Sequence, residues 1–544
     1  MVKDFRIVQS ETINSMARRR LTLFGLFLFV SSAVALCGPG RIDIVDGQTR
    51  YEVARSLVDH GDDVIRDDRV WFGVFPGRDG RPYTYYRFPQ SAVGVLAILC
   101  SDATGPVSEG RRHFFFTLTG AVACGLLAVI YAGLFRHLGH TSKAALLWAW
   151  AGIFCTPSWF YGTSTYDDIL GTVAVTLAVA IALMSRHRKP LRGALAAGLI
   201  LGLAFNCKQP LGVFILAVLA AGHDRRLGLR EQSPRIILAL IGLAIGVAAY
   251  KGYDLYKFPP GTIEGHGELL KKYAPNWPGH PVLALLALMF SLGTGVFFYF
   301  PPLLIAIRGI RAWFRTEGWF CLAVLSATGV FVLFIASMTI FKGDPAWGPR
   351  YLTPIFAILW IFAPAGAGLP RRRVSISLLV LGFVVQLGAL SVDPHRLYVE
   401  HRLPSAFYVE KPWLYFHPAI SHLANRPREI VEILTRGNVR AQQFSPSPSP
   451  WFAFPVIDFV ANGPEAVRRY HVLNSFRPWW ISQRYLTFER PIALGRTAIL
   501  FVLLAALGLA FQWRVLTSSR SEGAATPGPI EKNALSESQR RHSW

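Results

Sequence analysis

Charged residues are scarce in this sequence, and this excludes a chain built from ordinary soluble domains. Only 16% of the 544 residues are Asp, Glu, Lys or Arg, whereas 52% are hydrophobic. Soluble domains usually carry about 25% charged residues. The composition therefore predicts a polytopic membrane protein.

Acidic residues are the scarcer of the two charged classes. The chain has 33 Asp and Glu against 56 Lys and Arg, which gives a net charge of +23. A nucleic-acid-binding protein would gather these cations on one face or in one tail. Here they fall in short clusters between apolar segments, as in MARRR, SRHRKPLR and PRRRV. That pattern is typical of membrane topology signals, so we expect no nucleic-acid partner.

Cysteines at metal or redox spacing are also lacking. The six cysteines lie mostly inside or beside apolar segments, with no CxxC pair and no histidine at zinc spacing. This excludes a disulfide framework and a zinc motif, and the sequence assigns no metal ligands. The cofactor stays unknown, because a divalent metal held by carboxylates is possible but two oxygen ligands alone do not define a site.

Long apolar runs, by contrast, are abundant and predict an all-α polytopic membrane protein. Because a helix needs about 20 apolar residues to cross a bilayer, we expect about 12 transmembrane helices. They are predicted near residues 21–37, 113–136, 145–163, 168–184, 193–207, 210–222, 235–252, 283–308, 319–341, 350–366, 374–391 and 493–514. The first run resembles a secretory signal, but Leu36 precedes Cys37 where a lipoprotein cleavage site has a small residue, so we expect an uncleaved helix.

The basic clusters predict how the chain is oriented. With the N-terminus inside, every basic cluster between the spans falls on the cytoplasmic side. We therefore expect a multi-pass protein of the cell membrane with both termini cytoplasmic. The predicted parts are a cytoplasmic N-terminus at 1–20, a transmembrane domain at 21–391 with an outer loop at 38–112, a small outer subdomain at 392–492, a last span at 493–514 and a disordered cytoplasmic tail at 515–544.

The first outer loop contains two segments that we expect at the membrane interface. Asp46 is a candidate N-cap, and Gly61 is a candidate stop signal. Between them, an amphipathic helix at 48–60 would lie on the membrane surface and place on one side Tyr51, Val53, Ala54, Leu57 and Val58. The segment FPQSAVGVLAILC at 88–100 is too short for a secure span and is interpreted as interfacial or re-entrant.

Ionisable residues avoid the centres of the predicted spans and collect at their outer ends. They are Asp43, Asp46, Asp167, Asp168, Lys208, Lys251, Lys342, Asp344 and Arg350. A carboxylate can act as a general base towards a hydroxyl, and Arg or Lys can neutralise a phosphate leaving group. Together they suit group transfer from a lipid phosphate, although each residue also has a structural interpretation: Asp46, Asp167 and Asp168 as helix caps, and Lys208 as a snorkelling side chain.

Several segments resemble those of one family. DGQTRYEVARSLVDHGD resembles the first outer loop of the GT-C membrane glycosyltransferases, in particular the protein O-mannosyltransferase and lipid A aminoarabinose transferase branch. The matching residues are Asp46, Arg50, Tyr51, Glu52, Ala54, Arg55, Gly61 and Asp62. YYRFPQSAVGVLA, LGLAFNCKQPLGVFIL, MFSLGTGVFFYFPPLL and WGPRYLTPI look like further family segments, in the expected order. The resemblance covers residues 20 to 390.

The resemblance implies a GT-C-like fold, a mechanism and a partner. The donor would be a polyprenyl-phosphate sugar, and the acceptor a glycan, lipid or protein on the outer face of the membrane. Asp46 would be the base of an inverting transfer, and Arg87 with Lys208 or Arg350 would hold the donor phosphate. The family often has a second acidic residue after the first-loop aspartate, where this chain has Gly47. Asp43 and Asp168 are therefore alternative catalytic carboxylates, and Arg50, Tyr51, Asp167, Lys342 and Asp344 are further site candidates.

Two other classes of function stay open. A transporter or flippase of lipid-linked sugars would use the same donor, although such proteins place polar sites near the membrane midplane. An assembly protein would use the region 392–492 to bind a partner. Sugar transfer that depends on the candidate aspartates would distinguish a glycosyltransferase from a transporter and from an assembly protein.

Overall fold

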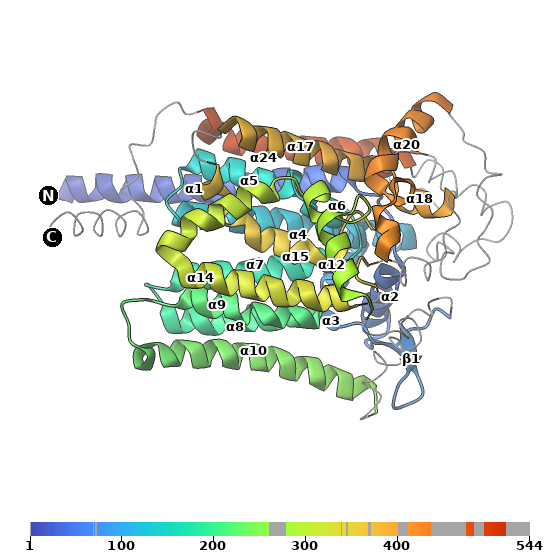
Figure 1. The fold of residues 1–544 in the computed structure, drawn as a ribbon, viewed down its shortest axis with the longest axis horizontal. Helices are drawn as coiled ribbons and strands as arrows, with labels where there is room; N and C mark the ends of the chain where they lie inside the picture. Colours follow the sequence, from blue (N-terminus) through green and yellow to red (C-terminus); the bar gives the residue numbers. More distant parts are fainter. Residues whose placement is uncertain are drawn as a thin grey trace.

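The computed structural model describes residues 2–68, 70, 73–259, 279–338, 340–343, 346–367, 372–400, 412–436, 475–482 and 494–517. In this part of the chain, the regular structure is helical except for one antiparallel ribbon, in which β1 (Val74–Pro76) pairs with β2 (Pro82–Thr84). The long helices lie side by side in one bundle, and short helices gather at one end of it (Figure 1). The predicted all-α class is confirmed.

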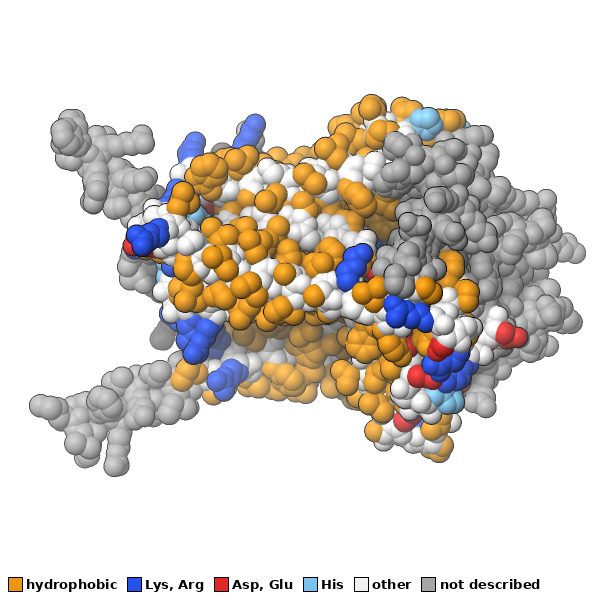
Figure 2. Space-filling model, turned by 90° about the horizontal axis from the view of Figure 1, so that it is seen from below, with side chains coloured by type: hydrophobic (Ala, Val, Ile, Leu, Met, Phe, Trp, Pro, Cys, Tyr) orange, Lys and Arg blue, Asp and Glu red, His pale blue; other side chains and the backbone are white. Residues whose placement is uncertain are grey.

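Eight described helices contain a stretch long and apolar enough to cross a membrane. They are α1 (Val2–Cys37), α4 (Glu109–His137), α7 (Asp168–Ser185), α8 (Pro190–Cys207), α10 (Leu229–Lys257), α14 (Leu303–Ser337), α17 (Arg372–Ser391) and α24 (Leu494–Thr517). Large apolar side chains on them are exposed, such as Ile241, Val384 and Leu503. Such a surface, seen as the apolar middle of the molecule in Figure 2, requires lipid rather than water. The protein is a multi-pass membrane protein.

The other described elements are short. They are α2 (Val45–Asp59), α3 (Phe88–Asp102), α5 (Ser142–Phe154), α6 (Ser158–Gly162), η1 (Gln209–Phe214), α9 (Ile215–Gly222), α12 (Pro281–Phe290), α13 (Val296–Tyr299), η3 (Arg350–Leu352), α15 (Thr353–Trp360), α16 (Ala363–Gly366), α18 (His395–Glu400), η4 (Pro412–Phe416), η5 (Pro418–Ile420), α20 (His422–Arg436) and α23 (Trp479–Ser482). Several predicted spans coincide with pairs of these pieces, such as α5 with α6 and η1 with α9. The total of about 12 spans stays a prediction.

Helix α14 is longer than a membrane is thick. Its 35 residues would extend about 52 Å if straight, against a hydrocarbon core of about 30 Å. Glu317 has non-helical dihedral angles, φ −134° and ψ 45°, and divides the helix into two arms, which Figure 1 shows on either side of a bend. The Glu317 carboxylate accepts a hydrogen bond from Arg186 at 2.8 Å. The bend is thus fixed to the end of α7.

The two ends of the bundle differ in charge. At one end α4 and α7 finish and α10 begins, and the basic residues there include Arg136, Arg188 and Arg226. We call it the basic end, and Figure 2 shows Lys and Arg gathered there, beyond the apolar middle. The opposite end, which carries α2, α3 and the start of α7, is the cluster end. The predicted gathering of basic segments is therefore seen, and their cytoplasmic location stays a prediction.

The described pieces of the predicted outer subdomain are attached to the cluster end. Asp393 accepts a hydrogen bond from Arg41 at 2.6 Å, and the indole N–H of Trp479 donates to the carbonyl of Ala35 at 3.0 Å. Residues 401–411, 437–474 and 483–492 of this region lie outside the described residues, as does the predicted tail beyond Thr517. Its status as a separate subdomain stays a prediction.

Candidate active site

Helix α2 brings the first-loop residues to the cluster end, but not as the sequence predicts. Ile44, not Asp46, occupies the N-cap position, and no side chain caps the helix. Asp46 lies in the first turn instead, because its carboxylate turns towards Arg350. The predicted helix of the first loop is present, but Arg50 and Glu52 are buried as well as Tyr51, and its place on the membrane surface stays a prediction. The helix ends before Gly61, as predicted.

Six charged side chains form a continuous series of ion pairs, which we call the charge cluster. Its members are Asp46, Arg50, Asp167, Asp168, Lys208 and Arg350. The Arg350 guanidinium contacts Asp46 at 3.3 Å and Asp168 at 2.8 Å. The Lys208 ammonium pairs with Asp168 and lies 3.7 Å from Asp167. Asp167 pairs with Arg50 at 2.9 Å. The series therefore starts and ends on α2, one helical turn apart.

Burial is nearly complete in this cluster. The side chain of Asp168 is fully buried, that of Arg350 is 2% exposed, and Lys208 is the most open at 17%. Aromatic rings cover the cations: the Arg350 guanidinium lies 3.6 Å from the ring centre of Tyr166, and Arg50 lies 4.1 Å from that of Tyr86. Three carboxylates and three cations balance one another, so the group buries no net charge, and loss of any one member would leave a buried charge uncompensated.

Two glycines allow these elements to approach one another. A Cβ atom on Gly47 would lie 2.3 Å from the hydroxyl oxygen of Thr165, so no side chain fits directly after Asp46. Gly348 has φ +64°, a conformation that favours glycine, and a Cβ there would lie 2.7 Å from the ring of Tyr299. The turn at Gly348 starts the segment that delivers Arg350.

Asp43 lies outside the charge cluster and is held by polar partners. Its carboxylate accepts hydrogen bonds from the Thr165 backbone N–H at 2.9 Å and hydroxyl at 2.7 Å, and from the Ser164 hydroxyl at 2.9 Å. Arg477 donates a further bond at 3.2 Å. Such a set of bonds suits a residue that joins the end of α1 to the loop before α7.

Replacement of Asp43 tests this assignment. We expect Asp43→Asn to lower the free energy of unfolding by about 2–4 kcal/mol, because it removes the carboxylate that pairs with the buried Arg477 at 3.2 Å. Any transfer activity should persist at temperatures at which the variant is folded. Thermal unfolding and activity of the same preparation check this. Loss of activity at unchanged stability would instead make Asp43 the catalytic carboxylate.

Arg87 belongs to a neighbouring group rather than to the charge cluster. Its guanidinium pairs with Asp254 of α10 at 2.7 Å and lies 4.0 Å from the ring centre of Tyr250. The Tyr250 hydroxyl also bonds with Gln209, the residue that follows Lys208. Arg87 is therefore next to the cluster but is engaged by a carboxylate of its own.

The remaining predicted site residues are dispersed. The Tyr51 hydroxyl donates to Glu109 of α4 at 2.8 Å, away from Asp46. Lys342 is buried with its ammonium 5.5 Å from the ring centre of Tyr415, and burial lowers its pKa to about 7. Asp344 lies outside the described residues.

Sequence reasoning missed the aromatic residues of the site. Tyr86 lies beneath Arg50, and burial, followed by the charge of Asp46, raises the pKa of its hydroxyl well above 10. It therefore keeps its proton beside Asp46. Tyr166 directly precedes the pair Asp167 and Asp168, and Tyr86 directly precedes Arg87. A tyrosine directly before a candidate charged residue was the sequence signal that could have identified these aromatic residues.

Glu52 is the most perturbed carboxyl of α2. Its side chain is 1% exposed and pairs with Arg55 at 2.6 Å. Burial raises its pKa from 4.5 to about 7, and the attraction of Arg55 opposes this shift only in part. The folded protein thus binds a proton at Glu52 more tightly than the unfolded chain does.

This shift predicts a pH dependence of stability. Between pH 4.5 and 7 the unfolded chain has released this proton and the folded protein has not, so stability falls as the pH rises. We expect Glu52 to contribute a decrease of about 3 kcal/mol across this window, and Glu52→Gln to remove it. Thermal unfolding as a function of pH measures the slope. Asp79→Asn is the control, because the hydrogen bond from Arg81 lowers the pKa of Asp79 and places its titration below the window. An unchanged slope in Glu52→Gln would contradict the assignment.

The next question is whether side chains of this site could coordinate a metal ion. In the part of the chain that the structure describes, no group of three His, Cys, Asp or Glu side chains lies close enough to hold one. Asp46 and Asp168 both contact the guanidinium of Arg350. In this arrangement a cationic side chain, supplied by the protein, lies between these two carboxylates.

Comparisons with solved structures gave matches that include the following two. The chain is similar to ArnT from Cupriavidus metallidurans in the apo state, with 14% identity over 82% of this chain and 84% of that chain and a TM-score of 0.46. It is also similar to the Archaeoglobus fulgidus oligosaccharyltransferase in complex with zinc and sulfate, with 11% identity, 78% and 57% coverage, and a TM-score of 0.37. No protein-family model matches the chain, and no curated protein matches its sequence.

Proposed function

We propose that this protein is a membrane glycosyltransferase that moves a sugar from a polyprenyl-phosphate donor to an acceptor on the outer face of the membrane. The observation that carries the proposal is the contact of Arg350 with both Asp46 and Asp168, beside Lys208. A carboxylate that can accept a proton lies next to cations that can bind a phosphate. The site lies at one end of an apolar bundle, where the headgroup of a lipid donor would be found.

The reaction follows from these roles. Asp46 takes the proton of an acceptor hydroxyl, and the oxygen attacks the anomeric carbon of the donor sugar. The bond between this carbon and the phosphate oxygen breaks, its electron pair leaves with the polyprenyl phosphate, and the configuration inverts. Lys208 and Arg350 neutralise the leaving phosphate. In the structure both cations contact Asp168, so a donor phosphate would compete with this carboxylate for them.

The alternative catalytic carboxylates fit this scheme less well. Asp43 is saturated by four hydrogen bonds, and Asp168 is fully buried between Lys208 and Arg350. Asp46 is 9% exposed and has the longer ion pair, at 3.3 Å. Arg87 would need to leave Asp254 to reach a phosphate, so we assign it to the donor only as a second contact.

Release of polyprenyl phosphate tests the function. The purified protein in lipid is given a panel of polyprenyl-phosphate sugars together with a broad acceptor extract, and the free lipid phosphate is measured. Release coupled to labelling of an acceptor supports a glycosyltransferase. Movement of the labelled donor across a vesicle membrane without any transfer would favour the transporter or flippase. If the aspartates are dispensable but region 392–492 is required, the protein is an assembly factor.

A further inference from the structure

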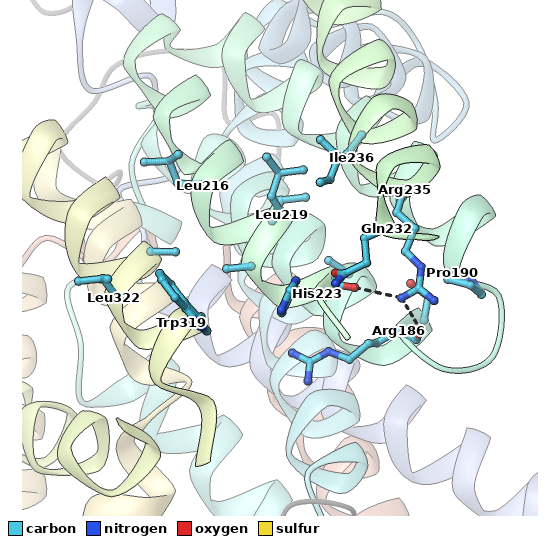
Figure 3. A pocket seen from close by; sticks show the side chains of 18 of the residues that line it. Arg186, Pro190, Leu216, Leu219, His223, Gln232, Arg235, Ile236, Trp319 and Leu322 are labelled. Carbon is cyan, nitrogen blue, oxygen red and sulfur yellow. Dashed lines mark hydrogen bonds between the residues drawn. The ribbon is translucent and has the colours of Figure 1, made fainter. Parts of the chain in front are cut away.

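A second site lies at the basic end, separate from the charge cluster. A pocket of about 560 Å³ lies between α7, α8, α9, α10 and the second arm of α14. Figure 3 shows side chains that line it. Helix α7 begins at Asp168 in the charge cluster and ends at Ser185 in the pocket wall. At 1.5 Å per residue, the two sites are about 25 Å apart.

The wall of the pocket has an apolar part and a cationic part. Leu216, Leu219, Ile236, Trp319 and Leu322 line the first, and Arg186, His223, Gln232 and Arg235 line the second. Figure 3 shows Leu216, Trp319 and Leu322 on the side opposite the two arginines, and Ile236 on the same side as Arg235. No carboxylate is among the described residues that line it. The pocket is therefore amphipathic, and its cationic part holds Arg235 together with Arg186, which is ion-paired with Glu317.

The two arginines are held in place from behind. Arg186 donates to Glu317 and to the carbonyl of Ala221, both at 2.8 Å. Its Nη2 atom is buried and has no hydrogen-bond partner among the described residues. Arg235 donates to the carbonyls of Arg186 and Gly222 at 3.3 and 3.4 Å. Fixed guanidinium groups with spare donors are suited to phosphate oxygens.

The apolar part of the pocket opens towards the side of the bundle. Trp319 is 67% exposed and Leu216 is 42% exposed, on helices whose outer surfaces are apolar. A tryptophan at this level is typical of the interface between lipid tails and headgroups. The pocket is thus open to the membrane, with its arginines at the depth of the headgroups.

We propose that this pocket binds an anionic membrane phospholipid, with an acyl chain against Leu216 and Trp319 and the phosphate at Arg186 and Arg235. A free phosphate would leave the apolar part unused, and a zwitterionic lipid would bring no net charge to match the arginines. Basic pockets between transmembrane helices bind acidic headgroups. The proposal does not depend on the glycosyltransferase assignment.

Photo-cross-linking of the full chain in phosphatidylcholine vesicles tests this. Phosphatidylglycerol and phosphatidylcholine analogues carry a photoreactive group on one acyl chain, and the labelled peptides are mapped. We expect phosphatidylglycerol to label α9 and residues 319–326 at least about fivefold more strongly. Arg235→Gln should remove most of this preference, whereas Arg226→Gln, an exposed cation outside the pocket, should not change it.

A variant that fills the pocket with a larger side chain provides a second test if Arg235→Gln does not fold. Leu219→Trp leaves the charges in place, fills the apolar part and should reduce labelling of this site by both analogues. Equal labelling by the two analogues, or labelling unchanged in Leu219→Trp, would overturn the proposal. If millimolar inorganic phosphate prevented labelling by the phosphatidylglycerol analogue, the site would be one for free phosphate, and this result would also overturn the proposal.

Discussion

Asp46→Asn is expected to lower the rate of polyprenyl phosphate release at least about 100-fold while the protein stays folded. A positioned general base usually contributes 10²- to 10⁴-fold to a rate. Asparagine keeps the size of the side chain and one acceptor oxygen, but it cannot take the proton of the acceptor hydroxyl. Arg350 keeps Asp168 as its partner in this variant, so the charge cluster loses only the 3.3 Å contact between Arg350 and Asp46.

The matched control for this variant is Asp102→Asn. Asp102 is also a paired carboxylate at the cluster end, 2.6 Å from Arg112, but it lies outside the proposed site. The release of polyprenyl phosphate by both variants is measured in the same lipid, and donor binding is measured in a second assay. Together these measurements distinguish a loss of catalysis from a loss of folding. If Asp46→Asn is as active as Asp102→Asn, Asp46 is not the base, and Asp43 and Asp168 become the candidates to replace next.

Arg350→Gln is expected to have the largest effect on stability. It removes a cation that is 2% exposed and leaves the fully buried Asp168 with Lys208 alone. Breaking a buried pair in this way costs about 3–5 kcal/mol. The double variant with Asp168→Asn should lose less than the sum of the two single changes, because it removes both charges of the pair. Thermal unfolding of the purified variants in lipid measures these differences.

An exposed arginine provides the comparison. Arg81 is 51% exposed and pairs with Asp79 at 2.6 Å, so Arg81→Gln should lower stability much less than Arg350→Gln does, because water screens an exposed ion pair. Equal losses in Arg350→Gln and Arg81→Gln would show that the charge cluster does not contribute to the stability of the fold. Arg350→Lys then separates charge from geometry, because lysine keeps the charge but lacks the two-pronged guanidinium.

The sequence was sufficient to predict that Asp46, Asp168, Lys208 and Arg350 meet. Each lies where a predicted span ends on the same side, and the closing of the bundle brings such ends together. The apolar pattern also predicts the long helices, because the length and the periodicity of an apolar segment depend on local residues. These predictions required only the order of the spans and the clustering of basic residues.

The partners of individual charges could not be predicted in this way. Arg87 resembles a phosphate ligand in the sequence, but in the structure it pairs with Asp254, which is 167 residues away. The position of Asp46 depends on where α2 begins: Ile44 occupies the N-cap, so Asp46 lies in the first turn with its carboxylate towards Arg350. No local sequence signal distinguishes this arrangement from one in which Asp46 caps the helix. Contacts of this kind depend on tertiary packing.

The bond between Asp43 and Arg477 has a consequence for synthesis of the protein. The two residues are 434 positions apart in the chain. At translation rates of about 5–20 residues per second, Arg477 leaves the ribosome roughly 20–90 seconds after Asp43. Throughout this interval the first loop and the start of α7 lack the arginine that joins them in the finished protein. The nascent chain therefore completes the surroundings of Asp43 only when almost all of its membrane helices have been made. Until then the insertion machinery handles a precursor in which Arg477 is not yet present to pair with Asp43.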